Sequence, residues 1–258
     1  MFFDDDEQKN KIVADNDISA PPKIETSKDI KIWRKLLLLV TGIGGIFIFS
    51  LLATLLVNIF SFEYDEQKIG VINFVTYGLL FLTLLGIVNV DIIKFKNDFN
   101  KFLPYLIGFG FGVAMIIFPI IYNLIINSFY ESSVNENESS LRNIIAIYPI
   151  LSLIFFGFLG PICEELTYRV GLFGILKKPK WLAYVIGTLV FALAHFSFSS
   201  VNIINELINL PIYIVSGFLM CLAYDKFGLA ASLTAHTVNN VYSVTMVIIY
   251  NFLNSLVS

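Results

Sequence analysis

The residues of this chain that could perform chemistry are a few ionisable side chains within stretches apolar enough to span a membrane. The chain has two histidines, His195 and His236, and each lies in such a stretch. Glu164, Glu165 and Arg169 lie at the end of another apolar run. Ionisable groups are costly inside a bilayer, so they are read first as functional. The three stretches carry complementary chemical types, which predicts one shared site.

These side chains suit the hydrolysis of a peptide bond. A buried Glu164 held near an imidazole could take a proton from water, and the water would then attack an amide carbonyl. A neutral histidine such as His236 and the carboxamide of Asn240, one helical turn later, could stabilise the oxyanion; Asn239 could substitute for Asn240. Alternatively, Glu164, His195 and His236 could bind a divalent metal such as zinc, which would acidify the water itself. The residues leave the two mechanisms open.

Glu165 and Arg169 have the spacing of a structural ion pair. They are separated by four residues with the acid first, which is the favourable order on a helix. The pair leaves Glu164, about 100° further round the helix, free to face another helix. Pro161 is expected to kink or loosen this helix just before the glutamates.

Composition places the chain in a membrane. It has 258 residues, of which 57% are hydrophobic and 14% charged, with a mean hydropathy of +0.77, whereas a soluble domain is about 25% charged. No alternation typical of a membrane barrel is seen, so the predicted fold class is all-α, a polytopic helical bundle. Two cysteines, Cys163 and Cys221, do not indicate a disulfide framework. A nucleophilic Cys163 is the less favoured alternative to simple packing.

Seven apolar segments are long or apolar enough to be membrane spans. They lie at Leu36–Phe60, Ile69–Val90, Leu103–Ile126, Asn143–Leu166, Trp181–Phe196, Leu207–Tyr224 and Leu229–Leu253. The last could form two half-helices, so seven to eight spans are expected. Residues 1–35 read as a disordered cytoplasmic tail, 36–142 as three accessory helices, and 143–258 as the domain that carries the chemistry.

The loops indicate how the spans are oriented. Lysines and arginines precede the first span and occupy the loops after the second, fourth and sixth spans, whereas the alternate loops are acidic or neutral. Basic loops face the cytoplasm, so the N-terminus is predicted to be cytoplasmic. At the helical rise per residue, Glu164, His195, His236 and Asn240 lie about 15 to 22 Å from the basic loops. We therefore expect them at one level, at the midplane or in the cytoplasmic half.

At these residues the sequence resembles the CPBP (CAAX protease and bacteriocin-processing, or Abi) family of intramembrane proteases, which includes the type II CAAX prenyl endopeptidases. The family pattern is matched, in order, by Glu164-Glu165-x-x-x-Arg169, Phe191-x-x-x-His195 and His236-x-x-x-Asn240. The resemblance covers roughly Asn143 to the C-terminus. It implies a helical bundle with a membrane-embedded cavity open toward the cytoplasm.

The resemblance also implies roles for the motif residues. Glu164 and His195 would activate water, and His236 and Asn240 would hold the oxyanion. Whether a metal takes part stays open. The expected partners are the lipid bilayer and a membrane-associated or lipidated peptide or protein, as in pheromone or bacteriocin processing or immunity, with no nucleic acid.

Two other functions are kept as alternatives. The chain could be a catalytically silent scaffold or regulator, although such a protein has no need of all four site residues. It could also be a transporter that uses the buried acid and histidines as a proton relay, although no inverted repeat is seen. The Lys-, Ile- and Asn-rich composition suggests the cytoplasmic membrane of a low-GC bacterium. Because bacteria usually lack protein prenylation, a CAAX substrate is disfavoured.

Overall fold

The computed structural model describes residues 24–60, 65–176 and 178–257, and within these ranges the regular structure is entirely helical. This confirms the all-α polytopic bundle. Among the described residues, five helices are long and apolar enough to cross a membrane: Ile32–Val57 (α2), Asp65–Asn89 (α3), Phe102–Ile126 (α5), the continuous helix Pro149–Phe173, and Ile203–Phe227 (α10). The fifth and seventh predicted spans correspond to Lys180–Ala194 (α9) and Leu229–Val257 (α11). α11 is one unbroken helix, so the alternative of two half-helices is wrong.

The continuous helix Pro149–Phe173 changes its winding at the predicted weak point. It consists of Pro149–Ile154 (α7), a π-helical segment Phe155–Leu159 (η2), Gly160–Glu164 (α8) and a second π-helical segment Glu165–Phe173 (η3). Pro161 has no N–H to donate and its ring crowds the preceding turn, and the wider π winding before it relieves both problems. The loosening predicted from Pro161 is therefore present, and the helix continues past Gly171.

Three short helices were not predicted as separate elements. They are Ser27–Asp29 (η1), Ile92–Asp98 (α4) and Glu136–Ile147 (α6). The fourth predicted span, from Asn143, is wrong at its start, because α6 ends at Ile147 and Tyr148 leaves helical geometry before Pro149. A proline disfavours helical geometry in the residue before it.

The predicted tail needs a similar correction. Residues 1–23 lie outside the described residues. Residues 24–35 contain η1 and the first turn of α2, so the prediction of disorder up to residue 35 is wrong for this part. Ser27 and Lys35 are buried in it.

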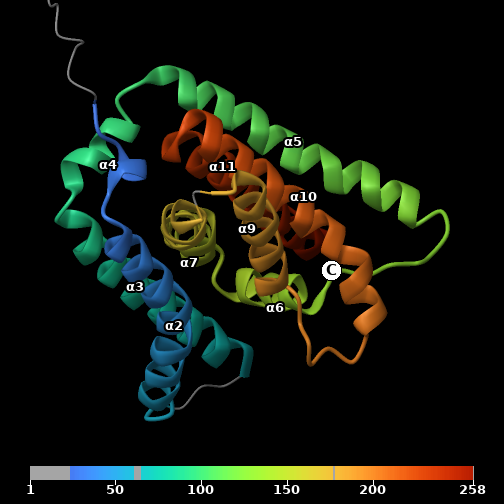
Figure 1. Ribbon diagram of the computed structural model, residues 1–258. Helices are drawn as coiled ribbons and strands as arrows, with labels where there is room; N and C mark the ends of the chain where they lie inside the picture. Colours follow the sequence, from blue (N-terminus) through green and yellow to red (C-terminus); the bar gives the residue numbers. More distant parts are fainter. Residues whose placement is uncertain (1–23, 61–64, 177, 258) are drawn as a thin grey trace, which may run out of the picture.

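Two helix pairs frame the bundle. α2 packs along α3 and against η3, while α11 packs along α5 and beside α10, as Figure 1 shows. Glycines make two of these approaches close, because small residues let helix backbones come near each other. A Cβ on Gly42 would overlap the side chain of Thr167, and one on Gly112 would lie 2.7 Å from Val238 Cβ. Gly110 points to open space, with nothing within 4 Å of a Cβ built there.

The two ends of the bundle differ in charge. One end carries α4 and the described residues that precede α2, at the top of Figure 1, and the other carries α6 and the connection between α9 and α10. Among the described residues, Lys68 and Arg142 are the basic side chains near the α6 end, and the other loop lysines and arginines lie at the α4 end. We call the end that carries α4 the basic end, and the opposite end the α6 end.

Candidate active site

His236 of α11 lies between two consecutive carboxylates of the continuous helix. Its Nδ1 is 3.1 Å from Glu165 Oε1, and its Nε2 is 3.7 Å from Glu164 Oε2. Neighbouring residues on a helix point about 100° apart, which lets the two glutamates reach opposite sides of one ring. The imidazole is 2% exposed, so both contacts are within the protein interior.

The predicted ion pair of Glu165 and Arg169 is present and fully buried. Arg169 Nε is 3.6 Å from Glu165 Oε2, and the two side chains are 0% and 1% exposed. The guanidinium also lies over the ring of Phe191, 5.0 Å from its centroid. Glu165 thus joins Arg169 to His236, which is the geometry of a support that fixes the orientation of the imidazole.

His195 is placed at the end of a helix rather than inside one. It is the C-cap of α9, and its Nδ1 is 2.9 Å from the carbonyl oxygen of Phe191. A carbonyl can only accept, so Nδ1 carries the proton and Nε2 of the neutral ring is an acceptor. The ring stacks on Tyr213 with centroids 4.8 Å apart. Phe191 lies between the two histidines, with its centroid 4.6 Å from that of His195 and 5.8 Å from that of His236.

Asn240 lies one turn beyond His236 and contacts the π-helical segment. Its Nδ2 donates to the carbonyl oxygen of Phe156 at 3.0 Å, and its Oδ1 accepts from Asn239 Nδ2 at 3.2 Å. One N–H of the carboxamide therefore holds the widened backbone of η2. The second N–H is left for a ligand, because a carboxamide has two.

All four predicted catalytic residues line one large cavity of about 1180 Å³. Its lining also includes Tyr77, whose hydroxyl donates to Glu164 Oε1 at 3.5 Å. Glu165 and Arg169 are not among the lining residues. The structure thus separates the glutamate that faces the cavity from the glutamate buried in the ion pair.

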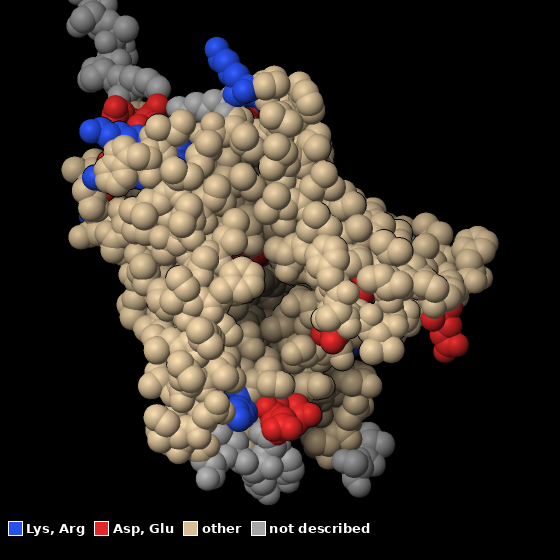
Figure 2. Space-filling view, turned by 60° about the horizontal axis from the view of Figure 1, so that its bottom comes forward, with Lys and Arg blue, Asp and Glu red and all other residues tan. Residues whose placement is uncertain are grey.

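The cavity extends from these residues toward the α6 end. On α5 it is lined from Met115 to Asn127, the half of that helix farther from the basic end, and on α11 it is lined from His236 to Asn251, toward the C-terminal end of that helix. Figure 2 brings the α6 end forward and shows a hollow at the centre of this face. The cavity therefore opens away from the basic end, which is the end that the loop charges predict to be cytoplasmic.

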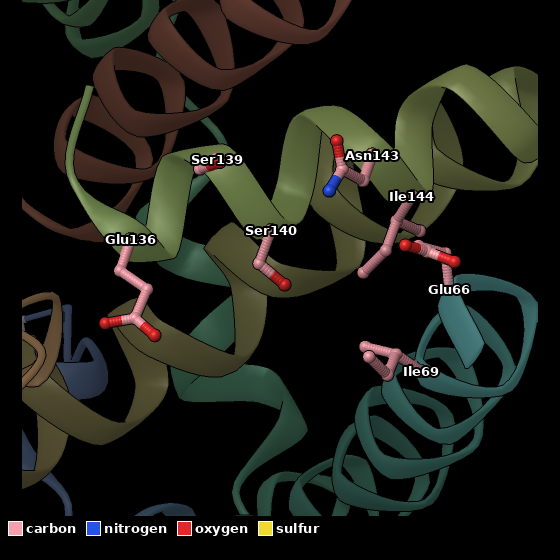
Figure 3. A pocket seen from close by; sticks show the side chains of 7 residues that line it. All are labelled: Glu66, Ile69, Glu136, Ser139, Ser140, Asn143 and Ile144. Atoms are coloured by element: carbon pink, nitrogen blue, oxygen red, sulfur yellow. The ribbon is translucent and has the colours of Figure 1, made fainter. Parts of the chain in front are cut away.

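A smaller cavity of about 230 Å³ lies between the start of α3 and α6 (Figure 3). Glu66 and Glu136 line it from opposite ends, so their carboxylates do not converge. It contains none of the predicted site residues.

The candidate ligands of a metal ion are Glu164, His195 and His236. Among the described residues, no group of three or more His, Cys, Asp or Glu side chains is arranged to hold a metal ion. Glu164 and His236 are neighbours, but they do not form such a group with His195. Both ring nitrogens of His236 already face carboxylates. The arrangement does not fit a three-ligand metal centre, and no step is derived through one.

Asn135 is a residue of the site that the sequence reasoning missed. It is the N-cap of α6 and 1% exposed. Its Nδ2 donates to the carbonyl oxygen of His195 at 3.0 Å, and its Oδ1 accepts from the Tyr213 hydroxyl at 3.2 Å. An asparagine followed three residues later by Glu138 is an N-cap signature, which could have marked the helix but not its link to His195.

Glu206 is a buried acidic residue beside the segment that follows His195. It lies in the first turn of α10 and is 1% exposed. Its carboxylate accepts the backbone N–H groups of Glu136 at 2.8 Å and Ser197 at 3.0 Å. Glu206 therefore fastens the start of α6 to the segment that follows His195.

Comparison with known proteins gives a family match over the part of the chain that carries these residues. Residues 146–242 match the family model of the Rce1-like type II CAAX prenyl endopeptidases, and this segment contains Glu164, His195, His236 and Asn240. An uncharacterized protein of Mycoplasma capricolum is 29% identical over 168 residues, which cover 60% of this chain and 46% of that protein. No solved structure matches the chain.

Two further relatives have descriptive names. UPF0177 protein YvdC of Lactococcus lactis is 27% identical over 153 residues, covering 58% of each chain, and the membrane-embedded CAAX protease MroQ of Staphylococcus aureus is 27% identical over 172 residues, covering 63% of each chain. The chain thus spans between 46% and 63% of the lengths of these relatives.

Proposed function

We propose that the chain is an intramembrane endopeptidase, because residues 146–242 match the family model of the Rce1-like type II CAAX prenyl endopeptidases. It would hydrolyse a peptide bond of a membrane-associated peptide or protein in a bacterial cytoplasmic membrane. The bacterial relatives and the apolar helices support this setting. Processing of a secreted peptide or bacteriocin, or immunity to one, are the roles that suit it.

The observation that carries the proposal is the pairing of Glu164 with a buried histidine on the wall of a large cavity. In the proposed reaction, a water held by Glu164 and by the free Nε2 of His195 attacks the substrate carbonyl carbon, and Glu164 takes the proton. Asn240 donates its second N–H to the oxyanion, and His236 donates from Nε2 as an imidazolium whose Nδ1–H is held by Glu165. When the C–N bond breaks, the leaving amine takes the proton back from Glu164, which restores the site.

The test is cleavage of a panel of labelled membrane-associated peptides by the purified protein in detergent. We expect Glu164→Gln and His195→Ala each to lower kcat by about 10²-fold or more, because acid–base groups contribute about 10² to 10⁴. Glu131→Gln is the matched control, since Glu131 is exposed near the α6 end and does not line the cavity.

Other outcomes discriminate among the alternatives. Cleavage that is equally fast in wild type and Glu164→Gln would overturn the site assignment. If the wild type cleaves no peptide and Glu164→Ala leaves a cellular phenotype intact, the chain is a scaffold or regulator rather than an enzyme. Proton-coupled flux into liposomes that requires Glu164 would favour the transporter.

Chelator gives a separate prediction about metal. Because the described residues offer no three-ligand group, we expect cleavage to survive exhaustive treatment with a strong chelator. Activity that is lost in chelator and restored by zinc would mean that the site rearranges to bind metal in the presence of substrate.

A further inference from the structure

We propose that the substrate enters the site from the extracytoplasmic side of the membrane, as an extended and largely uncharged stretch of polypeptide. The inference rests on the proposed function, since only an enzyme has a substrate. Its evidence is the location, charge and lining of the cavity.

The first observation is the location of the cavity along the helices. On α3 it is lined by residues from Ile72 to Tyr77 and on α10 by residues from Asn209 to Ser216. Like the lining stretches on α5 and α11, they reach from the middle part of the helix toward the α6 end. A peptide could therefore reach Glu164 from the α6 end without displacing a helix.

The second observation is that the basic end is closed. Between Glu164 and that end lies an apolar cluster that includes Val170, Phe173 and Tyr224, each at most 7% exposed. Beyond it, the segment before α2 is fastened across the helix ends, because Lys28 Nζ donates to the carbonyl oxygen of Asp225 at 2.9 Å and Lys35 Nζ donates to that of Gly174 at 3.3 Å.

The third observation assigns the two ends to the two sides of the membrane. Cytoplasmic loops carry an excess of lysine and arginine within short distances of the spans. The described residues at the basic end include Arg34, Lys94, Lys96, Lys101, Lys180 and Lys226, whereas Lys68 and Arg142 lie near the α6 end. The open α6 end therefore faces away from the cytoplasm.

The fourth observation concerns what the cavity could bind. Nine of its lining residues are asparagines, and among the described residues the side chains of Asn123, Asn143 and Asn251 make no hydrogen bond to another residue. The charged lining residues other than Glu164 are Glu138 and Arg142, which pair with each other at 2.6 Å.

Carboxamides both donate and accept, as do the N–H and C=O groups that an extended peptide leaves unpaired. Apart from Glu164, which the proposed reaction uses, the lining has no unpaired charge, so a charged side chain of the substrate would lose its hydration on entry without gaining a partner. A long isoprenoid would leave these amides without partners. The lining therefore favours an uncharged polypeptide segment over a prenylated terminus.

Cysteine labelling tests the entry side without any cleavage assay. The native Cys163 and Cys221 are 1% and 0% exposed, so they give little background. Single variants Ser243→Cys and Asn251→Cys place thiols on the cavity wall, and Lys226→Cys places one at the basic end, where the lysine side chain is 58% exposed. Each is treated with a membrane-impermeant charged maleimide in spheroplasts of a bacterial host and in inverted membrane vesicles.

We expect Ser243→Cys and Asn251→Cys to be labelled in spheroplasts, and Lys226→Cys in inverted vesicles alone. Labelling of both cavity thiols in inverted vesicles alone would overturn the proposed entry side. Because labelling requires no hydrolysis, this result stands or falls independently of the proposed endopeptidase activity.

Protection of the same thiol tests the substrate class. In a Glu164→Gln, Ser243→Cys double variant, a capped eight-residue peptide of Asn, Ser, Ala and Val is expected to abolish labelling. A capped peptide ending in S-farnesyl cysteine, at the same concentration, is expected to leave labelling unchanged. The reverse order of protection would overturn the assignment of an uncharged polypeptide, and would point to a lipidated terminus.

Discussion

At the residue scale, the site consists of groups that meet the cavity and groups that hold them. His195 is held on three sides, by the carbonyl of Phe191, the ring of Tyr213 and the carboxamide of Asn135. A C-cap position has fewer backbone constraints than a helix interior, so these contacts fix the direction of Nε2. Tyr213 is therefore a positioning residue.

Substitution of Tyr213 separates its stacking from its hydrogen bond. Tyr213→Phe keeps the ring over His195 and loses the bond to Asn135, so we expect kcat to fall less than about tenfold, in line with one neutral hydrogen bond. Tyr213→Leu loses the ring as well, and kcat should fall further with KM nearly unchanged. Equal effects of the two variants on kcat would show that stacking does not orient His195.

The ion pair of Glu165 and Arg169 gives a prediction for stability. Arg169→Met leaves the Glu165 carboxylate buried without its cation, and breaking such a pair costs about 3 to 5 kcal/mol. The matched control is Arg142→Met, which breaks the exposed pair with Glu138 at the same four-residue spacing and should cost about 0.3 to 0.5 kcal/mol. Thermal unfolding in detergent compares the two, and similar losses would contradict a special role for burial.

At the element scale, a close contact between α5 and α11 helps to place His236, which lies on α11, in the site. α5 approaches α11 through Gly108 and Gly112, and a Cβ on Gly108 would overlap the backbone oxygen of Ala231. Ala231 lies five residues before His236 on the same helix. The distance between α5 and α11 thus bears directly on the site.

We expect Gly108→Ala to lower both thermal stability and activity, because a backbone oxygen cannot move aside as a flexible side chain can. Gly110→Ala on the same helix meets open space, so it should be neutral or stabilise the helix by about 0.5 to 1 kcal/mol. The measurement is thermal unfolding with cleavage assayed in parallel. If both substitutions had the same effect, helix propensity rather than the contact with α11 would explain the result.

At the scale of the whole molecule, the basic end joins several elements outside the spans. The Asp98 carboxylate at the end of α4 accepts the backbone N–H of Ser27 at 2.8 Å, and it lies near the start of α11, since a Cβ on Gly228 would be 3.3 Å from Asp98 Oδ1. Burial raises the pKa of the Asp98 carboxyl above its ordinary value of 3.8, although its hydrogen bonds oppose the shift.

The raised pKa of Asp98 predicts how stability depends on pH. A carboxyl that binds its proton more tightly when folded contributes most below its unfolded pKa, and that contribution falls as pH rises through the folded pKa. Asp98→Asn keeps an oxygen that can accept from Ser27 and does not ionise. We therefore expect the melting temperature of the variant, relative to that of the wild type, to increase as pH rises from about 3.8. Parallel curves in detergent from pH 4 to pH 8 would contradict this prediction.

Much of the architecture was accessible from the sequence because it depends on local properties. Runs of apolar residues predict helices whether or not their neighbours are known, and all seven predicted segments overlap helices of the structure. The spacing of Glu165 and Arg169 predicts their ion pair, because residues four apart share one face of a helix. The order of the three motifs identified the candidate catalytic residues, and the structure brings all four to one cavity.

Other features depend on how helices rotate and where they end, which a linear pattern does not specify. The tertiary structure alone placed His236 between Glu164 and Glu165, put His195 at a C-cap rather than inside a span, and recruited Asn135 from a distant loop. It also decided that the cavity opens at the α6 end. The sequence by itself determined the helices and the chemical types in them, because these follow from each residue and its near neighbours. Which groups meet, and from which side they are reached, follow from packing between segments far apart in the chain.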